Sequence, residues 1–150
     1  MRRLSFESPL GHLSISEETG RIVGLEWGGQ SNGVASPALL EAKRQLLQYF
    51  AGRRQSFDLP LASEGSAAEL RVWQLMAEIP YGETRSYGAL GRDLGLSPRA
   101  VGRCCGSNRL PIFIPCHRVV GSHGALGGYS GGNGSETKRR LLELERVLLL

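Results

Sequence analysis

The amino-acid sequence predicts an α+β fold, in which a small N-terminal antiparallel sheet with one helix precedes a mostly helical C-terminal domain with a helix-turn-helix. Apolar and polar residues alternate in short stretches before position 28, a pattern typical of strands. After position 66 the apolar residues recur at helical spacing. The 150 residues, 41% hydrophobic and 21% charged, have a globular composition, which excludes wholesale disorder, coiled coils and collagen-like repeats.

The N-terminal part contains three expected strands, which cover residues 4–7, 13–16 and 22–27. Pro9 and Gly11 lie between the first two strands, as in a hairpin turn. A helix over 38–50 follows, because Ser36 supplies an N-cap and Pro37 occupies the first helical position.

The stretch 52–66 has the composition of a linker, since it combines adjacent arginines with Pro60 and Gly65. One further strand is expected within it, at 57–59. We therefore expect two domains, an accessory α/β domain at 1–62 and a second domain at 63–150.

The second domain begins with an apolar-faced helix over 67–79, which Pro80 ends. Ser86 caps the next expected helix, 87–94. After a turn at 95–97 with a glycine at the helix end, a further helix runs from Pro98 to about residue 107. This spacing predicts a helix-turn-helix, although helical hairpins of this kind also occur in proteins that do not bind DNA.

The net charge of +4 lies entirely in the C-terminal half. Residues 1–65 carry seven basic and seven acidic side chains, whereas residues 66–150 carry eleven and seven. The excess of positive charge is densest in residues 85–118. This stretch contains one acidic residue, Asp93, and six arginines: Arg85, Arg92, Arg99, Arg103, Arg109 and Arg118. The planar guanidinium group suits phosphates and base edges, which favours a nucleic-acid partner. The alternatives are a solvated basic face or a genome that favours arginine codons.

No apolar run approaches the roughly 20 residues that a membrane span needs, and the N-terminus lacks an apolar signal segment. We expect a cytoplasmic protein without a membrane partner. The three cysteines, Cys104, Cys105 and Cys116, are an odd number late in the chain, which excludes a secreted disulfide framework. At least one thiol is expected to be free.

The segment Ile114-Pro115-Cys116-His117-Arg118-Val119-Val120 places a cysteine beside an imidazole and a guanidinium, within apolar residues. Neighbouring positive charge lowers a thiol pKa, and the thiolate is the nucleophile. On composition alone, a buried structural cysteine beside an incidental histidine is the competing interpretation.

The same heptapeptide resembles the active-site signature of the O6-alkylguanine-DNA alkyltransferases, also called methylated-DNA–protein-cysteine methyltransferases. Further motifs that resemble this family, in order and near its spacing, are Val72-Trp73, residues 79–84, Ser86-Tyr87-Gly88, Arg99-Ala100-Val101-Gly102, Asn108 with Pro111, residues 127–132, and Lys138 with Leu141-Leu142 and Glu145. The resemblance covers about residues 68–147. It implies single-turnover DNA repair, in which Cys116 irreversibly takes the alkyl group from O6-alkylguanine, and also from O4-alkylthymine.

The resemblance also implies the catalytic roles. Cys116 is the nucleophile, His117 its base acting through a water, and Glu145 the group that orients His117. Tyr87 gives a proton or hydrogen bond to the guanine ring. Asn108 pins the turn before an active-site strand, for which an ordinary helix C-cap is the alternative. Because two extra residues precede Lys138, Glu143 is a second candidate for the orienting carboxylate.

The remaining implied residues bind the base and the DNA. Val119, Tyr129, Ser130 and Gly131 contact a base flipped out of the stack. Arg99 fills the vacated space, unless it only contacts a phosphate. The other expected DNA contacts are Ser86, Ala100, Gly102, Arg103, Arg109 and Arg118. The stretch between Tyr87 and Arg99 is two residues shorter than the family pattern, and Arg109 replaces a usual proline.

The implied partner is double-stranded DNA containing O6-alkylguanine, bound by a monomer without cofactor or metal. The N-terminal part has no cysteine, and His12 is its only histidine, so we expect no zinc site there. Cys104 and Cys105 are expected to pack within the helix. Two alternatives differ in class: a lesion binder with an inert Cys116, and a helix-turn-helix transcription regulator.

Overall fold

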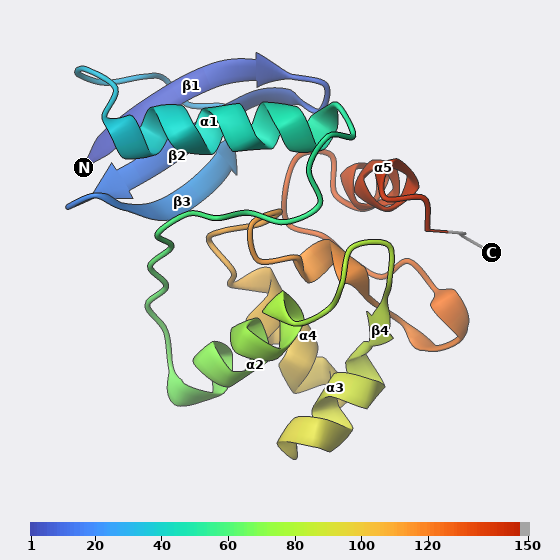
Figure 1. The fold of residues 1–150 in the computed structure, drawn as a ribbon. Helices are drawn as coiled ribbons and strands as arrows, with labels where there is room; N and C mark the ends of the chain where they lie inside the picture. The colour runs from blue at the N-terminus through green and yellow to red at the C-terminus, as the bar shows by residue number, and fades with distance from the viewer. Residues whose placement is uncertain (148–150) are drawn as a thin grey trace. The chain divides into compact units, whose positions relative to one another are not determined.

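The computed structural model describes residues 1–147 (Figure 1). The chain divides into two compact units, Met1–Ser63 and Glu64–Leu150. The division falls one residue after the expected boundary at 62, and each unit has its own core. None of the helices among residues 1–147 is long and apolar enough to cross a membrane.

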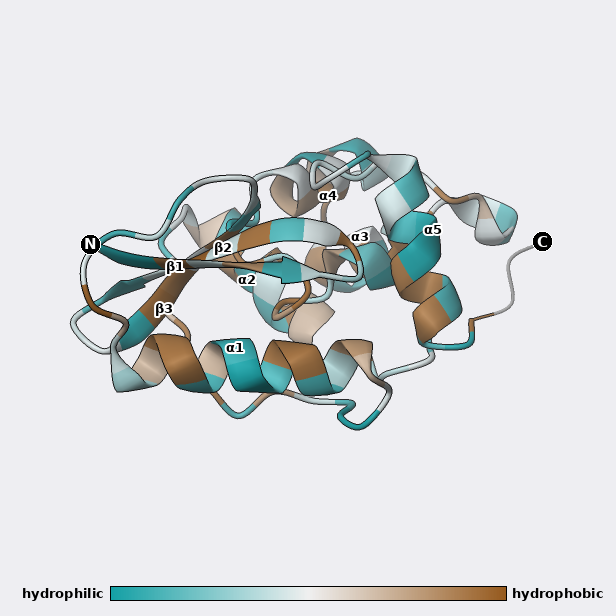
Figure 2. Cartoon of the chain, turned by 90° about the horizontal axis from the view of Figure 1, so that it is seen from above, coloured by the Kyte–Doolittle hydropathy of each residue, from teal (hydrophilic) through white to brown (hydrophobic). Residues whose placement is uncertain are grey.

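The first unit is an antiparallel sheet covered on one face by a helix (Figures 1 and 2). The sheet has the order β1-β2-β3 and comprises β1 (Arg2–Ser8), β2 (Gly11–Glu18) and β3 (Arg21–Trp27). The helix α1 (Pro37–Phe50) begins where the side chain of Ser36 accepts a hydrogen bond from the Leu39 amide. Leu13, Ile15 and Leu46 are fully buried between sheet and helix, so apolar burial holds this unit together.

The strand predicted at 57–59 is wrong. The Asp58 amide donates to the Gln45 side chain at 2.9 Å, and Pro60 has no N–H to donate to a ladder. Instead the chain pairs slightly later, where Ile22 donates to the Pro60 carbonyl and accepts from the Ala62 amide. This pairing is an isolated parallel bridge beside β3.

The second unit confirms the predicted helical arrangement. It contains α2 (Ala67–Ala77), β4 (Arg85–Ser86), α3 (Tyr87–Leu94), α4 (Pro98–Gly106), a 3-10 turn at Cys116–Arg118, β5 (Val119–Val120), a 3-10 turn at Ser122–Gly124 and α5 (Ser135–Leu144). The α+β fold class is therefore correct. Helix α2 ends two residues before the expected position because Glu78 and Ile79 form a tighter turn, with the Ile79 amide donating to the Met76 carbonyl at 3.0 Å.

The helix-turn-helix depends on two caps and a close approach. The side chains of Ser86 and Ser97 accept hydrogen bonds from the third residues of α3 and α4, as expected of N-caps. Gly95 ends α3 in the left-handed conformation. A Cβ on Gly91 would meet the Leu96 carbonyl oxygen at 2.3 Å, so the turn requires glycine there.

The active-site strand that was expected after the Asn108 turn does not form in the apolar segment before Cys116. Residues 111–114 form a turn closed by a bridge between Pro111 and Ile114, and Ile112 has a φ of 75°. A strand conformation would give Ile112 a negative φ, so this residue ends any ladder. The tight turn places Leu110, Ile112 and Phe113 in the core of the second unit, where all three are buried.

Candidate active site

Cys116 begins the 3-10 turn and its side chain is buried, with the residue only 5% exposed. The turn leads directly into β5, which pairs in parallel with β4 through Arg85↔Val119 and Ser86↔Val120. Because β4 runs into α3, this short pairing joins the cysteine segment to the start of the helix-turn-helix. Tyr87, the first residue of α3, is thereby placed near Cys116.

Asn108 ties the turn between α4 and Cys116. Its side-chain oxygen accepts from the Leu110 amide at 3.0 Å, and its side-chain nitrogen donates to the Ile114 carbonyl at 3.0 Å. These are the bonds expected of a residue that pins this turn; the C-cap of α4 is Ser107 instead. The same side chain also donates toward the sulfur of Cys116.

His117, Arg118 and Glu145 form a buried cluster. Nε2 of His117 lies 2.8 Å from Glu145 Oε2, and both side chains have no exposed surface. Arg118 grips the same carboxylate with Nε at 2.9 Å and Nη2 at 3.0 Å, and its Nη1 donates to the Ile79 carbonyl. Glu145 is thus a shared acceptor for a base and a cation, whereas Glu143 is exposed.

The position of Arg118 contradicts its expected DNA contact. Arg118 is 6% exposed, and its guanidinium is directed at Glu145 and the end of α2. A buried, bidentate guanidinium is unavailable to a phosphate. Arg118 instead positions the carboxylate that His117 uses.

The hydrogen bonds of His117 determine its tautomer. Since Glu145 is the acceptor at Nε2, that nitrogen carries the proton, and Nδ1 keeps its lone pair. Nδ1 is buried and has no hydrogen-bond partner among residues 1–147. Burial lowers the pKa of His117, against the opposing effect of Glu145, so the ring is neutral and able to accept a proton at Nδ1.

The environment of Cys116 works in two directions. Burial, the largest effect, raises the pKa of the thiol. The Asn108 side chain, the positive charge of Lys138 and the backbone N–H groups of Cys116 and His117 lower it. The site therefore offers stabilisation to the thiolate but needs a base to form it.

Lys138 is a site residue whose role its sequence motif did not reveal. Its Nζ lies 2.6 Å from the Val119 carbonyl, 3.2 Å from Tyr87 Oη and 3.2 Å from the Gly128 carbonyl, and the side chain is fully buried. Burial lowers its pKa to about 8. A lysine in a helix of otherwise exposed charge gave no signal in the sequence, because only the fold turns it inward.

The Gly-rich loop covers one side of the site. A Cβ on Gly127, whose φ is 75°, would meet Tyr87 Oη at 3.0 Å and Lys138 Nζ at 3.2 Å, so the loop approaches these groups through glycine. Tyr129 and Ser130 line a groove of about 730 Å³ that also exposes Cys116 and Tyr87. Gly131 follows in the same loop and is half-buried.

The expected DNA-binding residues divide into two groups. Arg99, Arg103 and Arg109 are exposed, whereas Ala100 and Gly102 are half-buried on α4. Arg99, Gly102 and Arg103 line the groove over Cys116. The Ser86 side chain serves as the cap of α3. Arg99 and Arg103 of α4 therefore line the same groove as the Cys116 thiol.

Comparison with known proteins gives matches over both units. The DNA-binding domain model of 6-O-methylguanine DNA methyltransferase matches residues 67–147, and the ribonuclease-like domain model of the same enzyme matches residues 1–63. The chain belongs to the methylated-DNA–protein-cysteine methyltransferase family. The constitutive enzyme of this name from Bacillus subtilis is 45% identical over 155 residues, covering 94% of this chain and 93% of the relative.

Solved structures agree with this membership. The crystal structure of Mycobacterium tuberculosis OGT in complex with DNA matches with a TM-score of 0.86 and 37% identity, over 97% of this chain and 93% of that one. As a member of this family, the present chain binds DNA and repairs it by transferring an alkyl group to a cysteine. Neither the inert lesion binder nor the transcription regulator is favoured.

Proposed function

We propose that Cys116 is the acceptor, that the substrate is O6-alkylguanine in duplex DNA, with O4-alkylthymine as a second lesion, and that one molecule acts alone and once. The observation that carries this proposal is the enclosed His117–Glu145 pair, whose unpartnered Nδ1 belongs to the residue next to a buried thiol. All the groups required come from one chain and need no cofactor. A monomer is therefore sufficient.

In the reaction, the Cys116 thiol gives its proton to His117 through a water, and Glu145 stabilises the resulting imidazolium. The sulfur attacks the alkyl carbon as the bond from that carbon to O6 breaks. A thioether forms, and the electron pair of the broken bond leaves with the guanine. Because a thioether has no leaving group that would regenerate the thiol, each molecule reacts once.

Tyr87 supplies a proton or hydrogen bond to the leaving base. Burial raises its pKa to about 12, so the hydroxyl remains protonated and able to donate. Nζ of Lys138 donates to the same oxygen at 3.2 Å, which stabilises negative charge on Tyr87 as its proton moves toward the base. Lys138 is thus a positioning residue for Tyr87.

The base reaches the thiol only when it is rotated out of the duplex. In this proposal Arg99 occupies the vacated space, which is supported by its exposure at the start of α4 and its place on the wall of the groove. Ser130 and the backbone carbonyls of Cys116 and Val119 form hydrogen bonds with the edge of the flipped base. Arg103 and Arg109, also exposed, contact phosphates.

Intact-mass measurement tests the proposal. After incubation with a duplex that carries O6-methylguanine, the mass should rise by one methyl group per chain, and peptide mapping should place it on Cys116. The variant Cys116→Ser should gain nothing. A methyl group on Cys104 or Cys105, or a mass that keeps rising, would contradict the assignment.

A further inference from the structure

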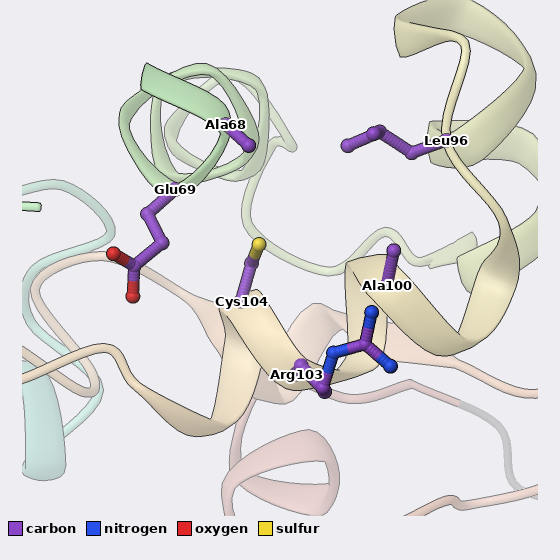
Figure 3. A pocket seen from close by; sticks show the side chains of 6 residues that line it. All are labelled: Ala68, Glu69, Leu96, Ala100, Arg103 and Cys104. Carbon is purple, nitrogen blue, oxygen red and sulfur yellow. The ribbon is translucent and has the colours of Figure 1, made fainter. Parts of the chain in front are cut away.

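Helix α2 makes contacts at both of its ends. Near its start, Glu69 lines a hollow between α2 and α4 (Figure 3), and its carboxylate accepts from the Ser107 hydroxyl at 2.5 Å. After its end, the turn at residues 79–82 contacts the C-terminal end of α5, where Glu145 orients His117. The second set of contacts reaches the proposed relay.

The Glu145 carboxylate is held by four hydrogen bonds. Its Oε2 accepts from His117 Nε2 at 2.8 Å and from Arg118 Nη2 at 3.0 Å. Its Oε1 accepts from Arg118 Nε at 2.9 Å and from the backbone amide of Gly82 at 3.4 Å. An ionised carboxylate offers about four lone-pair positions. These bonds therefore define the plane of the carboxylate and aim Oε2 at the imidazole.

Tyr81 contacts two of the groups that hold this carboxylate in place. Its hydroxyl donates at 3.3 Å to the carbonyl of Leu144, which is the last residue of α5 and precedes Glu145. Carbonyls at the end of a helix lack a partner within the helix, so this bond anchors the backbone that carries Glu145. The guanidinium of Arg118 lies over the Tyr81 ring, 5.8 Å from its centroid.

The electrostatics around Tyr81 agree with this arrangement. Burial raises the pKa of Tyr81, and the negative charge of Glu145 raises it further, so the hydroxyl stays protonated and remains a donor. Arg118 is also fixed by the residue that lies two positions before Tyr81, since its Nη1 donates to the Ile79 carbonyl at 2.7 Å. One short segment, residues 79–82, thus holds the carboxylate, its cation and the adjoining backbone.

We propose that Tyr81 is a positioning residue for alkyl transfer, because it holds the Glu145 carboxylate in line with His117. Its hydroxyl fixes the backbone before Glu145, whereas its ring supports the Arg118 guanidinium that binds the same carboxylate. This inference rests on the proposed relay to the thiol and adds a residue outside the cysteine segment that sets its geometry. Without these supports the carboxylate rotates away from Nε2, and the imidazolium loses part of its stabilisation.

Single-turnover transfer from a saturating duplex that carries O6-methylguanine measures the effect. Tyr81→Leu removes both supports and should lower the rate constant about 10- to 100-fold, as expected of a displaced positioning group. Tyr81→Phe keeps the ring over Arg118 and loses only the hydroxyl bond. It should therefore recover most of the loss and remain about two- to tenfold below the wild type.

The matched control is Ser107→Ala. This change also removes a hydroxyl whose hydrogen bond joins two helices of the second unit, but it does so at the opposite end of α2, where Ser107 donates to Glu69. Its rate constant should equal that of the wild type. A loss as large as that of Tyr81→Phe would show that the hydroxyl of Tyr81 has no special place.

A double-mutant cycle with Glu145→Gln shows whether Tyr81 acts through the carboxylate. The relay is already interrupted in Glu145→Gln, so adding Tyr81→Leu should change the rate constant by less than about twofold. The Nε2–H proton of His117 gives a second measurement, which does not require alkyl transfer. Its NMR signal should move in Tyr81→Leu toward its position in Glu145→Gln, and should stay in place in Ser107→Ala.

Three results would overturn the inference: a Tyr81→Leu rate constant within about twofold of the wild type, an equal loss with and without Glu145→Gln, or an unmoved His117 signal. If Tyr81→Leu does not fold, Tyr81→Phe takes its place, and its loss should disappear in the Glu145→Gln background. A wild type that transfers no methyl group refutes the proposed function instead. The His117 signal then still decides whether Tyr81 positions Glu145.

Discussion

Replacing Glu145 by glutamine removes one charge from a buried cluster. The carboxylate accepts from His117 at 2.8 Å and from Arg118 at 2.9 and 3.0 Å, and all three residues are at most 6% exposed. Glutamine keeps one acceptor oxygen but turns an amide N–H₂ toward donors. It leaves Arg118 charged and unpaired, which costs about 3–5 kcal/mol of unfolding free energy.

The same change should slow alkyl transfer, since a neutral partner no longer stabilises the imidazolium form of His117. General base catalysis contributes about 100- to 10,000-fold, and we expect a loss in this range. The unfolding free energy is measured by urea denaturation. Single-turnover transfer from a methylated duplex is followed by rapid quench, under conditions in which the variant is folded and still binds DNA.

Arg118→Met is the matched control, because it breaks the same buried pair without removing the acceptor of His117. It should lose a similar amount of stability, yet transfer within about tenfold of the wild type. It should also bind DNA normally, since Arg118 is buried. Equal rates for Glu145→Gln and the wild type, or equal losses in the two variants, would refute the relay.

Three other changes test the surrounding groups. The pKa of the Lys138 amine is about 8 in the folded protein against its usual 10.5, so the unfolded chain binds more protons between these two pH values. The unfolding free energy of the wild type should therefore rise with pH across this window, by up to about 3 kcal/mol relative to Lys138→Met. Urea titrations of both proteins at several pH values measure this difference, and parallel curves would contradict it. Arg99→Ala should slow repair of duplex DNA but not of the free alkylated base, because unstacking costs a few kcal/mol only in the duplex; an unchanged ratio of the two rate constants would reduce Arg99 to a phosphate contact. Gly127→Ala should lower the unfolding free energy by about 1–3 kcal/mol because of the positive φ at this position, and should slow alkyl transfer because the added Cβ crowds Tyr87. Gly128→Ala is the control, since a Cβ there meets no atom within 4 Å. Equal effects at both positions would exclude the close approach as the cause.

Local patterns in the sequence predicted most of the fold. Ser36, Ser86 and Ser97 each precede a helix at the residue that the structure uses as its N-cap, and Gly95 ends α3 as expected. These signals depend only on neighbouring residues. The expected strands at 57–59 and before Cys116 failed, because Pro60 removes a donor and Ile112 takes a positive φ that its β-branched side chain gave no reason to expect.

The site residues that belong to a sequence motif could be predicted from the sequence. The charged residues whose roles depend on burial in the fold could not. Cys116, His117 and Glu145 were named from their motifs, and the structure brings the last two together across 28 positions. Arg118 and Lys138 carry charges that sequence reasoning places at the surface. Each is buried because the fold supplies oxygen acceptors, three carbonyls, a tyrosine hydroxyl and a carboxylate, from distant segments.

The carboxylate that orients His117 comes from the residue that follows α5, far along the chain from the thiol. A nascent or clipped chain that ends anywhere between Arg118 and Glu145 would possess its nucleophile but not the group that holds the base. A fragment that ends before residue 141 would also lack Leu141 and Leu142, which are fully buried in the second unit. Docking of α5 therefore completes the site, because only then does the carboxylate of Glu145 reach His117.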